Sequence, residues 1–191
     1  MSTARENASP PWCVRLISEF NAADERATAL AKGLTPHQLA WAPGPGEWGI
    51  GQCLEHLCIA SDKYLPAIAS ALAGPPSTVV QEITPGWFGR WFISNYIEPS
   101  PKTKRAKAPK AIAPGSQSDP AILDRFLGSN DQAREIVRRA KACDVNRIRF
   151  RNPFVPVIRF TVGTGFEILS KHQRRHLLQA ERVRQAPGFP S

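Results

Sequence analysis

Four long stretches of the 191-residue chain repeat apolar residues at intervals of three and four, the period of an amphipathic α-helix. They cover residues 12–32, 49–72, 119–142 and 161–185, and proline or glycine punctuates the chain between them. A helix with one apolar stripe is stable only when another element covers that stripe. The pattern therefore predicts an all-α protein, a four-helix bundle with its functional site in the interior.

Short connections precede the second helix. Thr35–Pro36 combine a capping side chain with a proline in the first helical position, which favours a short helical turn through Leu39. Pro43–Gly46 then predict a loop that leads to Trp48. We expect Trp41 and Trp48 to be packing residues at the end of the bundle.

Two longer connections follow. Residues 74–118 form an irregular excursion, in which an aromatic cluster over 87–92 is expected to pack against one end of the bundle. Residues 144–160 alternate like a strand, but Pro153 and Pro156 favour an extended connection instead. We treat residues 1–11 as an N-terminal tail and residues 12–186 as a single domain.

Bulk properties narrow the class of protein. No run of ~18 apolar residues is present, so no membrane contact is expected. The N-terminus lacks the apolar core of a secretory signal, and the four cysteines show no CxxC pair, so we expect a cytoplasmic protein with reduced thiols. Cys53 precedes His56 by three residues and is a candidate ligand, although a buried apolar role is favoured.

The formal net charge of +9 favours anionic partners. Five basic residues fall within one Pro- and Ala-rich stretch, at Lys102, Lys104, Arg105, Lys107 and Lys110. No aromatic side chains interleave with them and no nucleic-acid motif is present, so a solvated basic loop is favoured over a nucleic-acid site. Whether this loop binds an anionic partner stays open.

Three of the four histidines form the most informative pattern. His172 and His176 are four residues apart, so their imidazoles lie about 40° apart on one helix face. His56 lies beside the apolar stripe of the second helix and can meet them in the interior. Three imidazoles of this kind predict a site for one divalent metal ion with at least one open coordination position.

Residues near the three histidines are weaker candidates. Glu47, Tyr64 and Gln179 are candidates for the groups that hydrogen-bond to ligating imidazoles. Glu55 lies about 100° around the helix from His56, which favours a salt bridge or a capping role over catalysis. His37 lies at the start of a short turn and is expected at the surface.

Three motifs together resemble the DinB-like superfamily. They are Trp41-Ala42-Pro43, then Gly46-Glu47-Trp48-Gly49-Ile50 followed by Leu54-Glu55-His56-Leu57, and finally His172-Gln173-Arg174-Arg175-His176-Leu177-Leu178-Gln179. The resemblance spans about residues 12–185. It implies an up-down-down-up four-helix bundle in which His56, His172 and His176 bind a divalent metal, zinc or nickel. Gly49 departs from the family's usual serine, which removes a side-chain cap but no ligand.

Two classes of function follow. Because better-understood members of that family use low-molecular-weight thiols, the resemblance implies a metal-dependent transferase acting on such a thiol, with a small-molecule substrate. A metal-dependent hydrolase is the alternative enzyme, since an open metal position also activates water. A non-catalytic, metal-stabilised binding protein is the alternative outside catalysis, and a homodimer is compatible with any of these. No general base near the ligands is evident in the sequence, which weakens the enzymatic interpretation.

Overall fold

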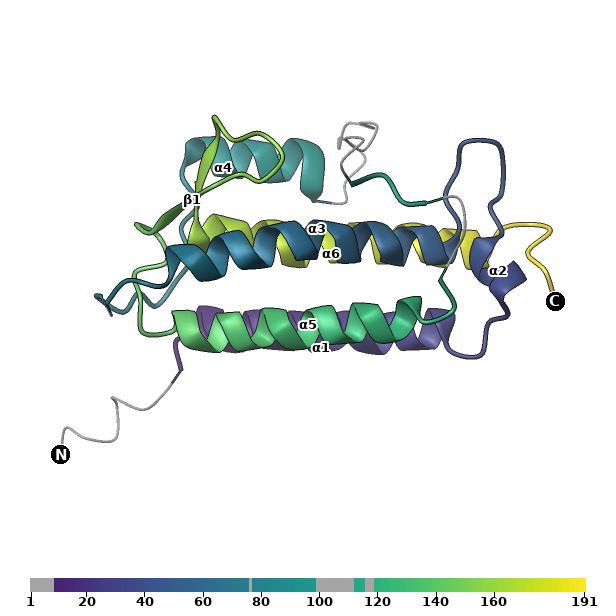
Figure 1. Ribbon diagram of the computed structural model, residues 1–191, viewed down its shortest axis with the longest axis horizontal. Helices are drawn as coiled ribbons and strands as arrows, with labels where there is room; N and C mark the ends of the chain where they lie inside the picture. Colours follow the sequence, from purple (N-terminus) through teal and green to yellow (C-terminus); the bar gives the residue numbers. More distant parts are fainter. Residues whose placement is uncertain (1–8, 76, 99–111, 116–118) are drawn as a thin grey trace.

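The computed structural model describes residues 9–75, 77–98, 112–115 and 119–191. It is mostly helical, with one small two-stranded sheet, in agreement with the predicted all-α class. Four long helices lie side by side, α1 (Pro11–Ala31), α3 (Ile50–Ala71), α5 (Ile122–Ala140) and α6 (Val162–Arg184). Figure 1 shows α1 and α5 in one layer and α3 and α6 in the other. Their bounds agree with the four periodic segments to within three residues.

The apolar stripes of the four helices meet in two clusters along the molecule. The first contains Phe20, Ile68, Val137 and Phe166, one from each long helix. The second contains Ala27, Leu54, Phe126 and Leu177, again one from each helix. Buried polar side chains lie where the first cluster gives way to the second on α5 and α6, at Asn130 and Gln173. The buried His56 on α3 and His176 on α6 lie next to residues of the second cluster. We call this level of the molecule the middle layer.

The short helix α2 (Pro36–Ala40) closes one end of the assembly. As predicted, Thr35 caps it, since the Thr35 hydroxyl accepts from the Gln38 backbone N–H and the Gln38 side chain accepts from the Thr35 N–H. The loop after α2 then passes close to Gly49, where a Cβ atom would lie 2.6 Å from the Trp41 carbonyl oxygen. A serine at this position would therefore clash with backbone, so the departure from the family motif is a packing requirement.

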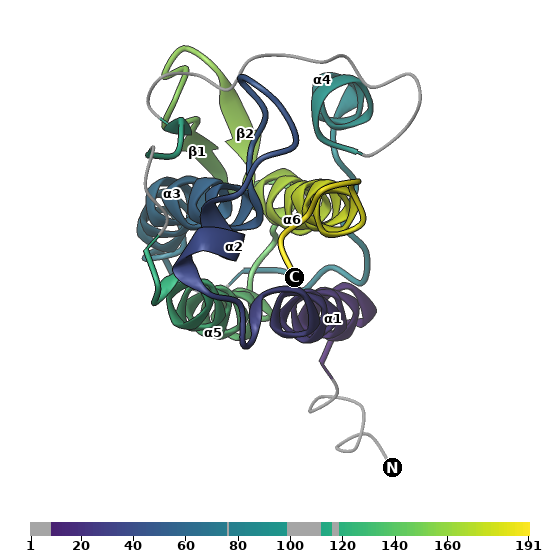
Figure 2. The same cartoon turned by 90° about the vertical axis from the view of Figure 1, so that its right-hand side faces the viewer.

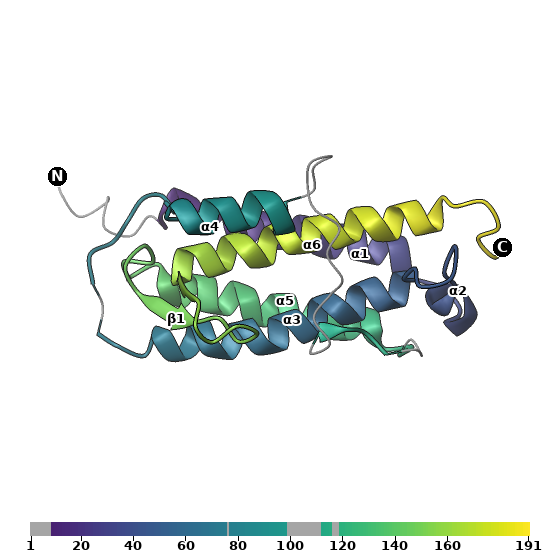
Figure 3. The same cartoon turned by 90° about the horizontal axis from the view of Figure 1, so that it is seen from above.

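The excursion after α3 contains α4 (Trp87–Phe92) and a π-helical turn, η1 (Ile93–Ile97). These turns lie alongside α6 (Figure 3). Phe88 and Phe92 pack on Phe160, as expected for an aromatic cluster. The tryptophans do not follow the expectation of burial, because Trp87 is 75% exposed and Trp91 is 44% exposed. Both tryptophan rings contact Phe88, but the described residues leave much of their surface open to solvent.

The expectation that residues 144–160 form an extended connection is wrong. Two antiparallel strands, β1 (Arg149–Arg151) and β2 (Arg159–Thr161), pair here as a β-ribbon, with Phe150 opposite Phe160. Both prolines fall in the turn between the strands, where no ladder hydrogen bond is lost. In Figure 2 the β-ribbon and α4 both lie on the α3–α6 layer, away from α1 and α5.

Other expectations concern helix ends, cysteines and the basic stretch. The helix α5 begins at Ile122, three residues after the predicted start at residue 119, and the Asp119 carboxylate accepts from the Ala121 N–H just before it. All four cysteines are free and buried. None of the helices in the described ranges has the length and apolar character needed to cross a membrane. The basic residues at 102–110 lie outside the described residues.

Candidate metal centre

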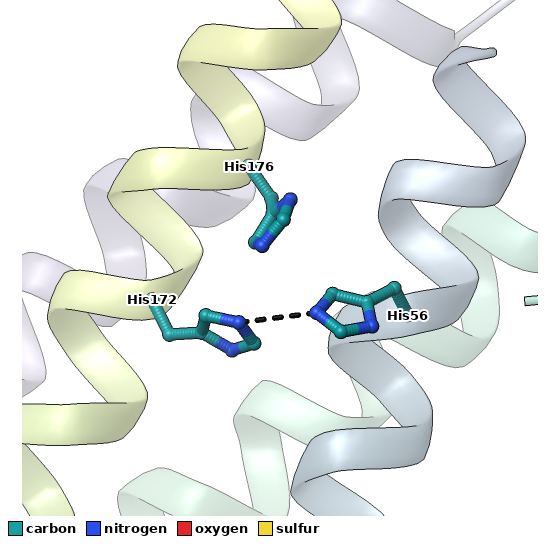
Figure 4. A group of neighbouring side chains, drawn as sticks. All are labelled: His56, His172 and His176. Atoms are coloured by element: carbon teal, nitrogen blue, oxygen red, sulfur yellow. Dashed lines mark hydrogen bonds between the residues drawn. The ribbon is translucent and has the colours of Figure 1, made fainter. Parts of the chain in front are cut away.

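Helices α3 and α6 lie against each other and bring the three predicted histidines together (Figure 4). The Nε2 atoms of His56 and His172 are 3.1 Å apart. The ring centroids of His56 and His176 are 4.5 Å apart, and those of His172 and His176 are 4.6 Å apart. One nitrogen from each ring lies within 4.8 Å of the others, so the three side chains converge on one point. His56 and His176 are buried.

This convergence follows from helix geometry. His172 and His176 project from successive turns of α6 toward α3, as the spacing of four predicts. His56 projects from the facing side of α3, between the buried residues Leu54 and Leu57. On α6 the two histidines lie between Leu169 of the first apolar cluster and Leu177 of the second. On α3 the residues next to His56, Leu54 and Leu57, belong to the second cluster, so packed apolar side chains hold both helices at this level.

Hydrogen bonds fix the orientation of two of the rings. The Nδ1 atom of His56 lies 2.7 Å from the carbonyl oxygen of Ile112, and a carbonyl only accepts, so this nitrogen carries the proton. The Nδ1 atom of His176 lies 3.0 Å from Oε1 of Gln179 and donates in the same way. In both rings the proton therefore resides on Nδ1, and the lone pair of Nε2 is directed at the centre.

Burial also keeps the rings neutral. It lowers the pKa of His176 to about 3, with the neighbouring His56 and Arg175 acting in the same direction. The pKa of His172 is well below its usual value, because of burial first and then the charges of the other two histidines and Arg175. Burial likewise lowers the pKa of His56. Neutral imidazole is the form that binds a metal ion.

Trp48 forms one wall of the site. Its ring centroid lies 4.8 Å from that of His56 and 5.7 Å from that of His176. The sequence motif correctly placed this tryptophan next to the histidine helix but predicted only a packing role at the end of the bundle. The sequence did contain a signal for this contact. Trp48 precedes His56 by eight residues, and His56 lies within two helical turns of the start of α3, so the tryptophan is near enough to reach the imidazole.

The profile of the DinB superfamily matches residues 19–180, well over half of the chain. The chain belongs to the DinB superfamily. This confirms the resemblance found in the three motifs, and all three histidines fall inside the matched range. No curated protein and no solved structure matches the chain.

In this DinB-superfamily protein the other candidates lie in different places. Gln179 contacts His176, whereas Glu47 is exposed in the loop before α3. The hydroxyl of Tyr64 bonds to Asn152 next to the β-ribbon, and among the described residues no hydrogen bond joins it to the histidines. Glu55 accepts from the Gly115 N–H at 3.0 Å, which is a contact with a distant backbone segment and not the salt bridge or helix cap that we expected. His37 is exposed, as expected.

The donor set fits a divalent transition metal. Two nitrogens bound to one ion at about 2.0–2.1 Å and a tetrahedral angle lie about 3.3 Å apart, close to the 3.1 Å between His56 and His172. Among the described residues no carboxylate or thiol joins the three histidines in a ligand group. Burial raises the pKa of the Cys53 thiol to about 12, which disfavours the thiolate that a ligand requires.

Proposed function

We propose that this protein binds one divalent metal ion through His56, His172 and His176. The observation that carries the proposal is the convergence of three neutral imidazoles, two of which have Nδ1 held by a hydrogen bond and Nε2 directed at the centre. Borderline-soft ions with a preference for imidazole suit such a set, so zinc and nickel are the leading candidates. The domain is residues 12–186, with the four long helices forming an up-down-down-up bundle around the ion.

The proposed activity is transfer of a low-molecular-weight thiol to a small electrophilic substrate. A divalent ion with an open position supplies a Lewis acid that lowers the pKa of a thiol bound to it. The chain contributes the rest of the site. Trp48 and the buried sides of α3 and α6 exclude water, while the hydrogen bonds from His56 and His176 hold the imidazoles in the ligating tautomer.

Elementary acidity favours thiol chemistry over hydrolysis. A metal ion with an open position lowers the pKa of a bound thiol and of a bound water alike, so the three histidines alone are compatible with both reactions. A free thiol starts from a pKa of about 8.5 and bulk water from about 15.7, so the thiol is the more readily deprotonated of the two. Family membership supports the same choice, since the better-understood relatives use thiols.

Metal analysis and a substrate panel test the proposal. The purified protein should contain about one divalent ion per chain, and small thiols should change the visible spectrum of the cobalt-substituted protein. Electrophiles should then be consumed only when both a thiol and the metal are present. A His37→Ala variant serves as the control, because this exposed histidine lies outside the site.

Each alternative has its own result in this panel. Turnover that is sensitive to chelators but independent of thiol would establish a hydrolase. Bound metal without turnover of any electrophile would establish a metal-stabilised binding protein. A protein that takes up no metal at neutral pH would refute the proposal altogether.

A further inference from the structure

Residues Ile112–Gly115 lie against α3 beside the candidate metal centre, and we call this segment the strap. Three side chains of α3 hold it. The His56 ring donates to the carbonyl of Ile112, the Gly115 N–H donates to Glu55, and the Gln52 amide donates to the Gly115 carbonyl at 2.9 Å. The side chain of Ile112 is buried, which anchors the other end of the strap.

The strap has no secondary structure beyond a single 3₁₀ residue, so the backbone itself does not fix its position. Its two ends are held differently. Ile112 is held by burial, whereas Gly115 has no side chain and depends on the hydrogen bonds with Gln52 and Glu55. Both of these bonds involve the main chain of Gly115, and together they satisfy its N–H and its carbonyl.

Gln52 also links the strap to the start of the helix. Its Oε1 atom accepts from the Gly49 N–H at 3.0 Å, while its Nε2 donates to the strap. The amide therefore uses its acceptor for the helix cap and its donor for the strap. Glu55 points away from the histidines around the helix and reaches the strap with one carboxylate oxygen.

We propose that Gln52 and Glu55 are positioning residues for His56, which act by holding the strap so that the Ile112 carbonyl keeps the imidazole in the tautomer with Nε2 free. This proposal rests on the proposed metal site only for its functional consequence. The effect on the tautomer belongs to the metal-free protein as well.

The chemistry requires such a device because the two nitrogens of a neutral imidazole exchange roles readily. His56 Nε2 is in contact with His172 Nε2, and a proton on the former would compete with a metal ion for that nitrogen. The Ile112 carbonyl removes this competition, since it accepts only from a protonated Nδ1. Loss of such an outer partner typically weakens metal binding about 10- to 100-fold.

Three substitutions separate positioning from general stability. Glu55→Ala removes the acceptor for Gly115, whereas Glu55→Gln retains one oxygen that can accept. Gln52→Glu keeps an acceptor for the Gly49 N–H but places a carboxylate oxygen against the Gly115 carbonyl. Glu25→Ala is the matched control, because Glu25 is an exposed acid on α1.

The first measurement is nitrogen NMR of ¹⁵N-histidine-labelled, metal-free protein at neutral pH. Wild type, Glu55→Gln and Glu25→Ala should show His56 with the proton on Nδ1 alone. Glu55→Ala and Gln52→Glu should show averaged shifts for the two nitrogens. A His56 that remains in the single tautomer in Glu55→Ala and Gln52→Glu would overturn the proposal, whatever the metal content of the protein.

The second measurement is zinc affinity by competition with a chromophoric chelator. Glu55→Ala and Gln52→Glu should bind zinc about 10- to 100-fold more weakly, and Glu55→Gln should recover most of the affinity. Equal affinity in all variants would overturn the proposed role at the metal site. If wild type itself binds no zinc, the proposed function fails, and the NMR result still decides whether the strap fixes the tautomer.

Discussion

The middle layer holds two polar clusters whose hydrogen bonding differs. The histidine cluster, His56, His172 and His176, lies between α3 and α6. The second, which we call the amide–carboxylate network, joins α1, α5 and α6. In it the Asn130 amide donates to Asp24, Arg134 donates to the same carboxylate, and the Gln173 amide donates to Asn130, each at 2.6 Å.

The two clusters differ in the directions of their hydrogen-bond donors and acceptors. In the amide–carboxylate network every donor that links the helices finds an acceptor within the protein, and Asp24 faces both Asn130 and Arg134. In the histidine cluster the donors point outward, to Ile112 and Gln179, and acceptor lone pairs converge in the centre. Donors that are satisfied within the protein fix the packing of helices, whereas converging acceptors offer a site for a cation.

The largest expected effect comes from removal of a ligand. His176→Ala and His172→Ala should each reduce metal content from about one ion per chain to background, a loss of affinity of at least ~1000-fold, or about 4 kcal/mol. Metal content after dialysis against a weak chelator measures this. Retention of stoichiometric metal in both variants would remove the distinction between the two clusters.

A substitution in the amide–carboxylate network should act on stability instead. Arg134→Met leaves the Asp24 carboxylate without its cation in a largely buried position, which should lower the free energy of unfolding by about 3 kcal/mol. Urea denaturation of the metal-free protein measures the loss. Folded Arg134→Met protein should still bind one metal ion, and a variant that folds but loses its metal would show that the two clusters are not separable.

The sequence predicted the histidine cluster but not the amide–carboxylate network, for a physical reason. His172 and His176 form a pattern within one helix, and helix geometry alone places them on one face. The partners of Asp24 come from other helices, so the network depends on how α1, α5 and α6 pack. In the sequence, Asn130 and Arg134 are ordinary polar residues of a helix with charged faces.

The sequence likewise predicted one part of the fold, the four long helices, and missed others. Periodicity located the four long helices, because each buries a stripe that recurs within its own sequence. The β-ribbon was missed, because Pro153 and Pro156 argue against a strand only when they lie within one, and here they lie in the turn between two strands. The strap was also unpredictable, since residues 112–115 reach His56 through the backbone carbonyl of Ile112, which has no sequence signal.

The pH dependence of stability should also distinguish the clusters. The histidines are neutral in the folded protein, with the pKa of His176 near 3, and they bind protons in the unfolded chain below about pH 6.5. The unfolded state therefore binds more protons between pH 6.5 and 3, so the stability of the metal-free protein should fall as the pH is lowered through this window. Each buried histidine contributes up to about 1.4 kcal/mol per pH unit.

Urea denaturation in the presence of a chelator at several pH values measures this slope. His176→Ala should reduce the slope, because one neutral buried histidine is removed. A slope in His176→Ala equal to that of wild type would show that this imidazole is not held neutral by the fold.

Two glutamines on α6 provide the finest comparison, because they lie six residues apart and each serves one cluster. Gln179 accepts from His176, and Gln173 donates to Asn130, while its own Oε1 has no partner among the described residues. Gln179→Leu should weaken zinc binding about tenfold, as expected for loss of the group that orients a ligating imidazole, with little change in unfolding. Gln173→Leu should do the opposite. It leaves the Asn130 oxygen unpaired, which should lower the free energy of unfolding by about 1 kcal/mol, while zinc affinity stays within a few-fold of wild type.

Zinc competition and urea denaturation of both variants measure these two quantities, affinity and stability, for each substitution. If each substitution changed both quantities equally, the middle layer would act as one network, and the division into a packing cluster and a binding cluster would be wrong.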